Sequence, residues 1–153
     1  MTEQSPRPQL EVVRRFWEAQ AAGDGQSARA VITDDMEWTV VGQHSSLART
    51  YYGADAFFNE LIGTLASTFV PGSAAMEMRG MYLDAEQSMV VTHLRETART
   101  HDGLFFDNDI VTIMNVTDGR ITRCQEFMDL HEVRRTFGEE NLRTPLATLN
   151  LEG

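Results

Sequence analysis

The chain has 153 residues and carries 13 basic against 23 acidic side chains, which leaves a formal net charge of -10. This charge argues against nucleic acid or an anionic membrane as a partner, since both attract clustered Lys and Arg, and no apolar stretch approaches the ~20 residues of a bilayer span. With 42% hydrophobic and 24% charged residues, the composition predicts one soluble domain over 1–153, with a core at about 9–137 and a polar tail at 138–153.

The first third of the chain predicts two helices and one strand. Apolar residues recur at helical spacing after a proline, and Gly23 follows as a stop, so an amphipathic helix is expected at 9–22. A short second helix is expected at 26–32. A turn then leads into a strand at 36–41, and 42–53 is expected to be a loop.

The rest of the chain predicts one helix followed by an antiparallel meander. The helix is expected at 55–69, and a last amphipathic turn at 131–137. Asp-Gly pairs and similar turn residues separate the β segments, which are expected at 74–83, 89–99, 104–116 and 120–129. This order is typical of an α+β fold in which the helices lie on one face of a sheet. Strands this long coil strongly, so the sheet is expected to enclose a conical cavity for a small organic molecule.

Several segments together carry a family resemblance: 15–24, the strand after Asp34-Asp35, 106–108, 117–121 and 126–129. Their order and spacing resemble the SnoaL-like branch of the nuclear transport factor 2 superfamily over about 10–137. That superfamily also contains ketosteroid isomerase and limonene epoxide hydrolase. The resemblance implies a cystatin-like α+β barrel, a cone-shaped mixed or antiparallel sheet wrapped around helices. Because this fold hosts many unrelated activities, the function has to be argued from the site.

The turn at 117–119 decides which way Glu126 points. A three-residue loop with a left-handed glycine would set Glu126 opposite Ile110, facing the cavity. A two-residue turn would set it opposite Val111 instead, which would turn it to the other face. The first register is the expected one.

The turn at Asp102-Gly103 decides the orientation of the preceding strand. A two-residue loop would set Arg95 opposite Ile110 and His93 opposite Thr112. Arg95, Ile110 and Glu126 would then form one row across three strands.

Glu126 is the candidate general base. Its neighbours on the same face, Cys124 and Met128, cannot solvate a carboxylate, so burial should raise the pKa of Glu126 toward a useful value. A buried ion pair with Arg95, or a carboxylate at the sheet edge, is an equal alternative. The resemblance also points to Glu126, because polyketide cyclases and limonene epoxide hydrolase carry a catalytic aspartate at this place.

His93 and Arg95 are the candidate partners of the base. They lie two residues apart, so they should share one face, where they would polarise a substrate carbonyl or hold a carboxylate. A hydrogen-bonded interior histidine is the plainer interpretation of His93.

Other side chains are expected to line the cavity and contact the substrate. Asn108 would donate to a substrate oxygen or satisfy backbone groups, and Tyr52 would gate the cavity mouth or be buried under a helix. Asp129 has the opposite strand parity and is expected to cap the last helix. The full set of predicted substrate contacts is Trp38, Asn108, Ile110, Thr112, Met128, Phe16 and Tyr52.

Cofactors and metals are not expected. Cys124 is the single cysteine, which excludes a disulfide within the chain and paired-thiolate zinc sites, and the four histidines show no ligand spacing. Residues 1–8 contain no apolar signal core, so a cytoplasmic location is expected.

This chain departs from two members of the superfamily at their functional positions, and these departures narrow the expected activity. The residues at the functional positions of ketosteroid isomerase are Phe16, Thr39 and Val111, which lack the required acids and donor. Limonene epoxide hydrolase needs an arginine and a second carboxylate where this chain has His93 and Arg95.

We therefore expect a cofactor-independent, polyketide-cyclase-like enzyme, a cyclase, isomerase or lyase that moves a proton next to a carbonyl of a small apolar substrate. The alternatives are a non-catalytic domain that binds a hydrophobic ligand or another protein, and a hydrolase of the epoxide hydrolase type.

A homodimer is also expected. Val90, Leu94, Val111 and Ile113 are expected on the convex face of the sheet, where the helices of one copy would leave them uncovered.

Overall fold

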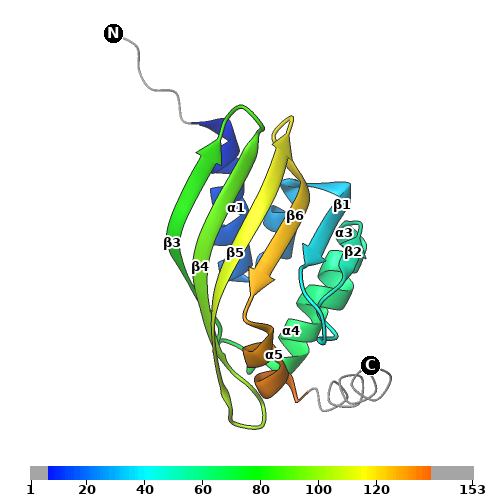
Figure 1. The fold of residues 1–153 in the computed structure, drawn as a ribbon, viewed down its shortest axis with the longest axis vertical. Helices are drawn as coiled ribbons and strands as arrows, with labels where there is room; N and C mark the ends of the chain where they lie inside the picture. The colour runs from blue at the N-terminus through cyan, green and yellow to red at the C-terminus, as the bar shows by residue number, and fades with distance from the viewer. Residues whose placement is uncertain (1–6, 139–153) are drawn as a thin grey trace, which may run out of the picture.

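The computed structural model describes residues 7–138, and it has an α+β architecture built on a six-stranded sheet. The strand order is β2-β1-β6-β5-β4-β3 (Figure 1), in which β1 and β6 are parallel and all other neighbours are antiparallel. The strands are β1 (Ile32–Val40), β2 (Thr50–Tyr52), β3 (Ala75–Asp84), β4 (Met89–Arg99), β5 (Phe105–Thr117) and β6 (Arg120–Met128). The predicted fold class is confirmed, and the sheet stays open.

The helices pack mainly against one face of this sheet. The longest, α1, lies behind the sheet in Figure 1 and contacts β3, β4, β5 and β6. The elements are α1 (Pro8–Ala22), α2 (Gly25–Ala30), α3 (Ala54–Ala56), the π-helix η1 (Phe57–Ile62), α4 (Gly63–Thr68) and α5 (Leu130–Phe137). No helix among the described residues is long and apolar enough to span a bilayer.

Local chemistry explains where several helices begin and end. Pro8 is the first residue of α1, and Gly23 ends that helix with a left-handed φ of 69°. Asp24 then caps α2 by accepting a hydrogen bond from Ser27 N at 3.1 Å. The predicted cap at Asp129 is confirmed, because its carboxylate accepts from His131 N at 2.9 Å.

The structure differs from the prediction in three elements. The helix predicted at 55–69 is interrupted by η1, and β1 begins at Ile32 rather than at 36. The segment predicted as loop contains β2, whose three residues pair with β1. A strand this short carries too few residues to show a period-2 pattern.

The register between β5 and β6 depends on a turn and a bulge together. The turn is the two-residue type, with Thr117 opposite Arg120, and not the three-residue loop that was expected. A bulge follows, in which Asn115 and Val116 pair with Arg123 and Ile121. The extra residue restores the inward parity, so Glu126 faces the cavity opposite Thr112 instead of Ile110.

The register between β4 and β5 is shifted by one residue from the prediction. The strands close at Arg99 opposite Phe105, and residues 100–104 form a longer loop than the expected two-residue turn. Thr100 closes this loop, because its backbone N donates to Leu104 O and its hydroxyl accepts from Leu104 N. A shift of one residue moves every side chain of β4 to the opposite face.

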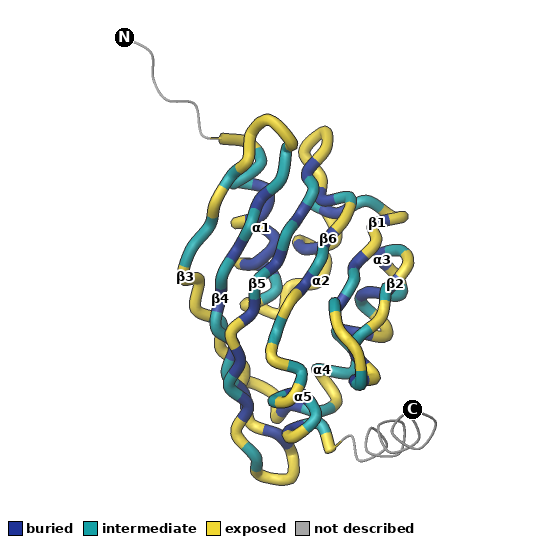
Figure 2. The backbone as a smooth tube through the Cα atoms, viewed as in Figure 1, coloured by how far each residue is buried: buried dark blue, intermediate teal, exposed yellow. Residues whose placement is uncertain are grey.

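The core lies between α1, the η1 segment and the inner face of the sheet. Buried residues alternate along β4 and β5, as the tube in Figure 2 shows. Three aromatic side chains meet at the centre: Trp38 lies 4.5 Å from Phe57 and 5.7 Å from Phe16 between ring centroids. These rings form the wall against which the candidate site is built.

Candidate functional site

Glu126 lies on the inner face of β6 with only 7% of its surface exposed, so its predicted burial is confirmed. Its carboxylate oxygen Oε1 accepts a hydrogen bond of 3.0 Å from Nε1 of Trp38, on the neighbouring strand β1. Burial raises the pKa of Glu126 to about 7, although the Trp38 hydrogen bond acts in the opposite direction. The group can therefore exchange a proton near neutral pH.

A second buried carboxylate, Glu96 on β4, was not predicted. It is 6% exposed, and burial is the largest cause that raises its pKa to about 7, followed by the charge of Glu126. Two carboxylates that repel each other in a poorly hydrated space lose their protons in two coupled steps. Both groups therefore titrate near neutral pH, and the charge of Glu126 favours the protonated form of Glu96.

Both carboxylates line the same narrow cavity, which has a volume of about 30 Å³. Space of this size holds about one water molecule. The remaining lining is almost entirely apolar and comes from α1, η1, α4 and four strands: Trp17, Gln20, Trp38, Phe57, Leu61, Ile62, Leu65, Met76, Leu94 and Ile110.

A much larger hollow of about 470 Å³ adjoins this cavity. Glu96, Gln20 and Met76 line both spaces. The hollow lies between the end of α1, the η1 and α4 segment and the start of β3, and it includes Phe58 and Phe69. A molecule entering here would meet Glu96 first and Glu126 beyond it.

The π-helical turn η1 helps to shape the cavity wall. Phe57 and Leu61 of this turn are buried, and Ile62 lines both the cavity and the hollow. A π-turn widens the helix and re-aims its side chains, and such turns occur frequently at functional sites.

Two of the predicted substrate contacts, Trp38 and Ile110, line the cavity beside Glu126. Phe16 is fully buried behind Trp38, as a support for the wall. Thr112 is also fully buried, and its hydroxyl is hydrogen-bonded to that of Thr92. Met128 is half-buried opposite Ile110.

The other two predicted contacts have different surroundings. Asn108 bridges the start of α5, because its Nδ2 donates to Asp129 O and its Oδ1 accepts from Asp129 N, both at 3.0 Å. Its amide therefore satisfies backbone groups, which was one of the two alternatives. Tyr52 is 71% exposed, so the alternative that it is buried under a helix is wrong, and it lines neither the narrow cavity nor the larger hollow.

The predicted inward placement of His93 and Arg95 is wrong. The one-residue shift turns both to the outer face of the sheet, where Arg95 pairs with Asp107 through Nε at 2.7 Å and His93 Nε2 lies 3.0 Å from Asp109. The Asp107 partner raises the pKa of Arg95 further. Neither residue lines the cavity that holds Glu126.

The polarity of β4 could have revealed this orientation. The positions facing inward are Val90, Thr92, Leu94, Glu96 and Ala98, whereas the outer positions include His93, Arg95 and Arg99. The more charged set belongs on the solvent face of a half-buried strand. The turn residues Asp102-Gly103 are a weaker guide to this orientation, because they lie within the longer loop at 100–104 and do not form a two-residue turn.

The same shift moves two of the four residues expected on the convex face into the core. Val90 and Leu94 are fully buried in the core, whereas Val111 and Ile113 are half-buried on the outer face, as expected.

Within residues 7–138, no group of three or more His, Cys, Asp or Glu side chains is arranged to hold a metal ion.

Comparisons with known proteins identify the family and the fold of the chain. A family model described as a SnoaL-like domain matches residues 13–124. A search of curated proteins found no significant match.

Many solved structures share the fold. Bal32a, from a soil-derived mobile gene cassette, is 21% identical with a TM-score of 0.75, covering 85% of this chain and 96% of its own. TerC, co-crystallised with polyporic acid, is 16% identical with a TM-score of 0.74, covering 86% and 99%. A putative SnoaL-like polyketide cyclase from Jannaschia sp. CCS1 is 16% identical with a TM-score of 0.73, covering 91% and 99%.

Proposed function

The chain belongs to the SnoaL-like domain family, and from its buried carboxylates we propose that it is a cofactor-independent enzyme that moves a proton next to a carbonyl group. The observation that carries the proposal is the Glu126 carboxylate, which lies in an apolar cavity with a raised pKa and a single indole donor on Oε1. The substrate class is a small apolar carbonyl compound, and the reaction is that of a cyclase, isomerase or lyase. Relatives of the same fold described as a putative polyketide cyclase and a putative isomerase support this choice.

Glu126 is the base in this mechanism. Its carboxylate takes the proton from the carbon beside the carbonyl, and the electron pair moves into the carbonyl to form an enolate. The apolar wall keeps the carboxylate poorly hydrated and therefore basic. Trp38 fixes one oxygen of Glu126, so that the other is free to face the substrate.

Glu96 replaces His93 and Arg95 as the partner of the base. In its protonated form it donates a hydrogen bond to the carbonyl oxygen, where negative charge develops. Its place at the boundary between the narrow cavity and the larger hollow allows it to contact a molecule held in the hollow.

Proton exchange tests the proposal without knowledge of the natural substrate. We expect the protein to accelerate deuterium uptake from D2O at the carbon beside the carbonyl of a probe ketone, 1-indanone, followed by proton NMR. Glu126→Gln should lower this rate about 100-fold or more while ketone binding changes little, because an amide is not a base. Glu86→Gln, on an exposed turn, is the matched control.

The pH profile separates the two carboxylates. The rate should be bell-shaped with a maximum near pH 7, since Glu126 must be ionised and Glu96 protonated. Glu96→Gln should remove the fall at alkaline pH, because the amide remains a donor. Equal exchange rates in wild type and Glu126→Gln would contradict the proposal and favour a non-catalytic ligand-binding domain.

A hydrolase is the second candidate, favoured by one observation. Two carboxylates line a space of about 30 Å³, which is enough for one water molecule. Incorporation of oxygen-18 from labelled water into product, with no deuterium at carbon, would identify this reaction.

We also propose that two copies associate through the outer face of the sheet. This face carries the half-buried Val111 and Ile113 together with Phe127 and Tyr82, which are 38% and 62% exposed. Apolar side chains in such a group favour burial against a second copy. Sedimentation should give the mass of a dimer, and a monomer at high concentration would refute the association.

A further inference from the structure

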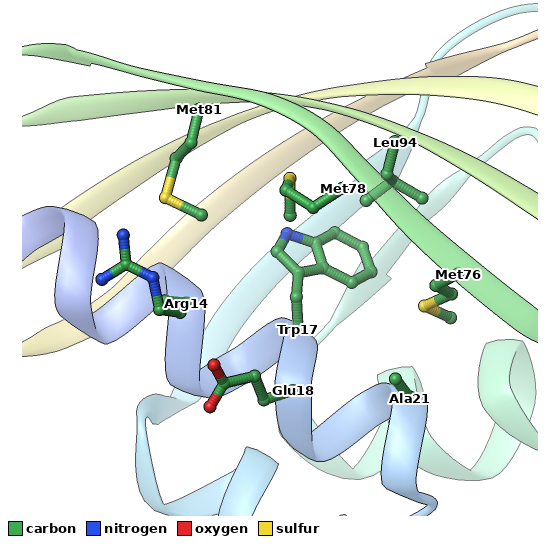
Figure 3. Close-up of a pocket in the computed structure, with 8 residues that line it drawn as sticks. All are labelled: Arg14, Trp17, Glu18, Ala21, Met76, Met78, Met81 and Leu94. Atoms are coloured by element: carbon green, nitrogen blue, oxygen red, sulfur yellow. The ribbon is translucent and has the colours of Figure 1, made fainter.

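A further hollow of about 300 Å³ lies between α1 and the edge strand β3, and it shares Trp17, Met76 and Leu94 with the narrow cavity. Figure 3 shows its floor and walls, in which three methionines of β3 face the indole ring of Trp17 on α1. Neither Glu96 nor Glu126 lines it. Its other lining residues are Arg14, Glu18, Ala21 and Leu94.

Trp17 carries an unused hydrogen-bond donor at this hollow. The residue is 7% exposed, and its Nε1 is buried with no hydrogen-bond partner among the described residues. In Figure 3 the nitrogen lies on the ring edge that faces Met78 and Met81. The ring is held by Phe16 and Trp38, at centroid distances of 5.1 and 6.2 Å.

A buried donor without a partner destabilises the protein unless something supplies an acceptor. An indole nitrogen only donates, so the missing partner must carry an acceptor. Methionine side chains adapt their shape and pack well on aromatic rings, which suits a hollow that receives a flat apolar molecule. The lining therefore fits a ligand that is apolar apart from one hydrogen-bond acceptor.

The charges at the rim indicate the charge of the ligand. Arg14 is already paired with Glu11 at 2.9 Å, and the Glu18 carboxylate lies on the same rim. The rim therefore offers no net positive charge to an anion, and the whole chain carries -10. A neutral ligand fits these surroundings best.

We propose that this hollow is a second ligand site, which binds a neutral, largely apolar small molecule through one oxygen acceptor, such as a ketone or lactone carbonyl, placed against Trp17 Nε1. The site does not depend on the proton-transfer proposal, because it contains neither carboxylate.

Indole NMR signals test the site directly. The chain has two tryptophans, so a nitrogen-15 spectrum shows two indole N–H signals, which Trp17→Phe assigns. The probes are 1-tetralone and tetralin, which share a ring system and differ in the carbonyl. The ketone should shift the Trp17 signal and bind about tenfold more tightly than the hydrocarbon, because it satisfies the buried donor.

Variants locate the binding site and control for folding. Met78 is 40% exposed, so Met78→Arg should fold normally, fill the hollow, and abolish the Trp17 shift. Ala75→Arg, at an exposed position on the outer face of the same strand, is the matched control, and Glu126→Gln should also keep the shift. Equal affinity for the two probes, a shift confined to Trp38, or an unchanged Trp17 response in Met78→Arg would each overturn the proposal.

Discussion

Replacing both Glu96 and Glu126 by glutamine is expected to remove most of the loss of stability that the wild-type chain suffers between mildly acidic and alkaline pH. Each carboxyl has its pKa raised from 4.5 to about 7 in the folded state, chiefly by burial. The neutral form is therefore the one that the fold favours. The stabilisation is fully present below about pH 4.5 and is lost as the pH rises through about 7.

The expected effect is large. A shift of this size corresponds to about 3 kcal/mol for each group once both states are ionised. Urea unfolding at a series of pH values from 5 to 9 measures it as the fall in the free energy of unfolding. The slope of the unfolding free energy against pH is the informative quantity. The absolute stability of a variant also changes, because an amide at either position has its own hydrogen-bonding requirements.

Single variants complete this experiment. Glu96→Gln and Glu126→Gln should each remove part of the pH dependence, whereas the exposed Glu86→Gln should leave the wild-type slope unchanged. The double variant would contradict the assignment if its stability declined with pH as steeply as that of wild type, since both carboxylates would then be well hydrated in the fold.

Phe57→Ala is expected to cost about 3 to 5 kcal/mol of unfolding free energy, as for other buried aromatic rings. Phe57 is 1% exposed and packs 4.5 Å from Trp38, between ring centroids. Its loss opens a void in the wall of the carboxylate cavity, where the π-turn cannot collapse without moving Leu61 and Ile62. Urea titration followed by circular dichroism measures the loss.

The same substitution should act on the candidate base. Water admitted beside Trp38 hydrates Glu126, so the pKa of Glu126 should fall toward its ordinary value and the acidic limb of the exchange profile should move to lower pH. Phe105→Ala is the matched control, because Phe105 is 53% exposed and its loss should cost less than about 1 kcal/mol. A Phe57→Ala protein as stable as this control would show that the wall has no structural role.

The sequence alone was sufficient to predict the fold and its family. Helical periodicity placed α1, long alternating segments placed the meander, and Asp129 before an amphipathic turn predicted the cap of α5. These features depend on neighbours within a few residues, whose preferences the sequence shows directly. The burial of Glu126 could also be predicted from the sequence, because its neighbours on the same face of the strand are apolar.

The tertiary structure decided which residue of β4 supplies the second carboxylate at the cavity. The face that a side chain occupies depends on register, and the longer loop at 100–104 shifts the pairing of β4 with β5 by one residue, which exchanges Arg95 for Glu96 at the cavity. Glu126 kept its inward orientation only because a bulge offsets the two-residue turn before it.

The sequence by itself therefore determined a cone-like α+β domain with an acidic group in its interior. The three-dimensional pairing of strands decided that the acid has Trp38 as its donor and Glu96 as its neighbour, and that Trp17 lies between two hollows. The physical reason is that side chains on a strand alternate every residue, so small changes in long-range pairing reassign whole faces, whereas local propensities are unaffected.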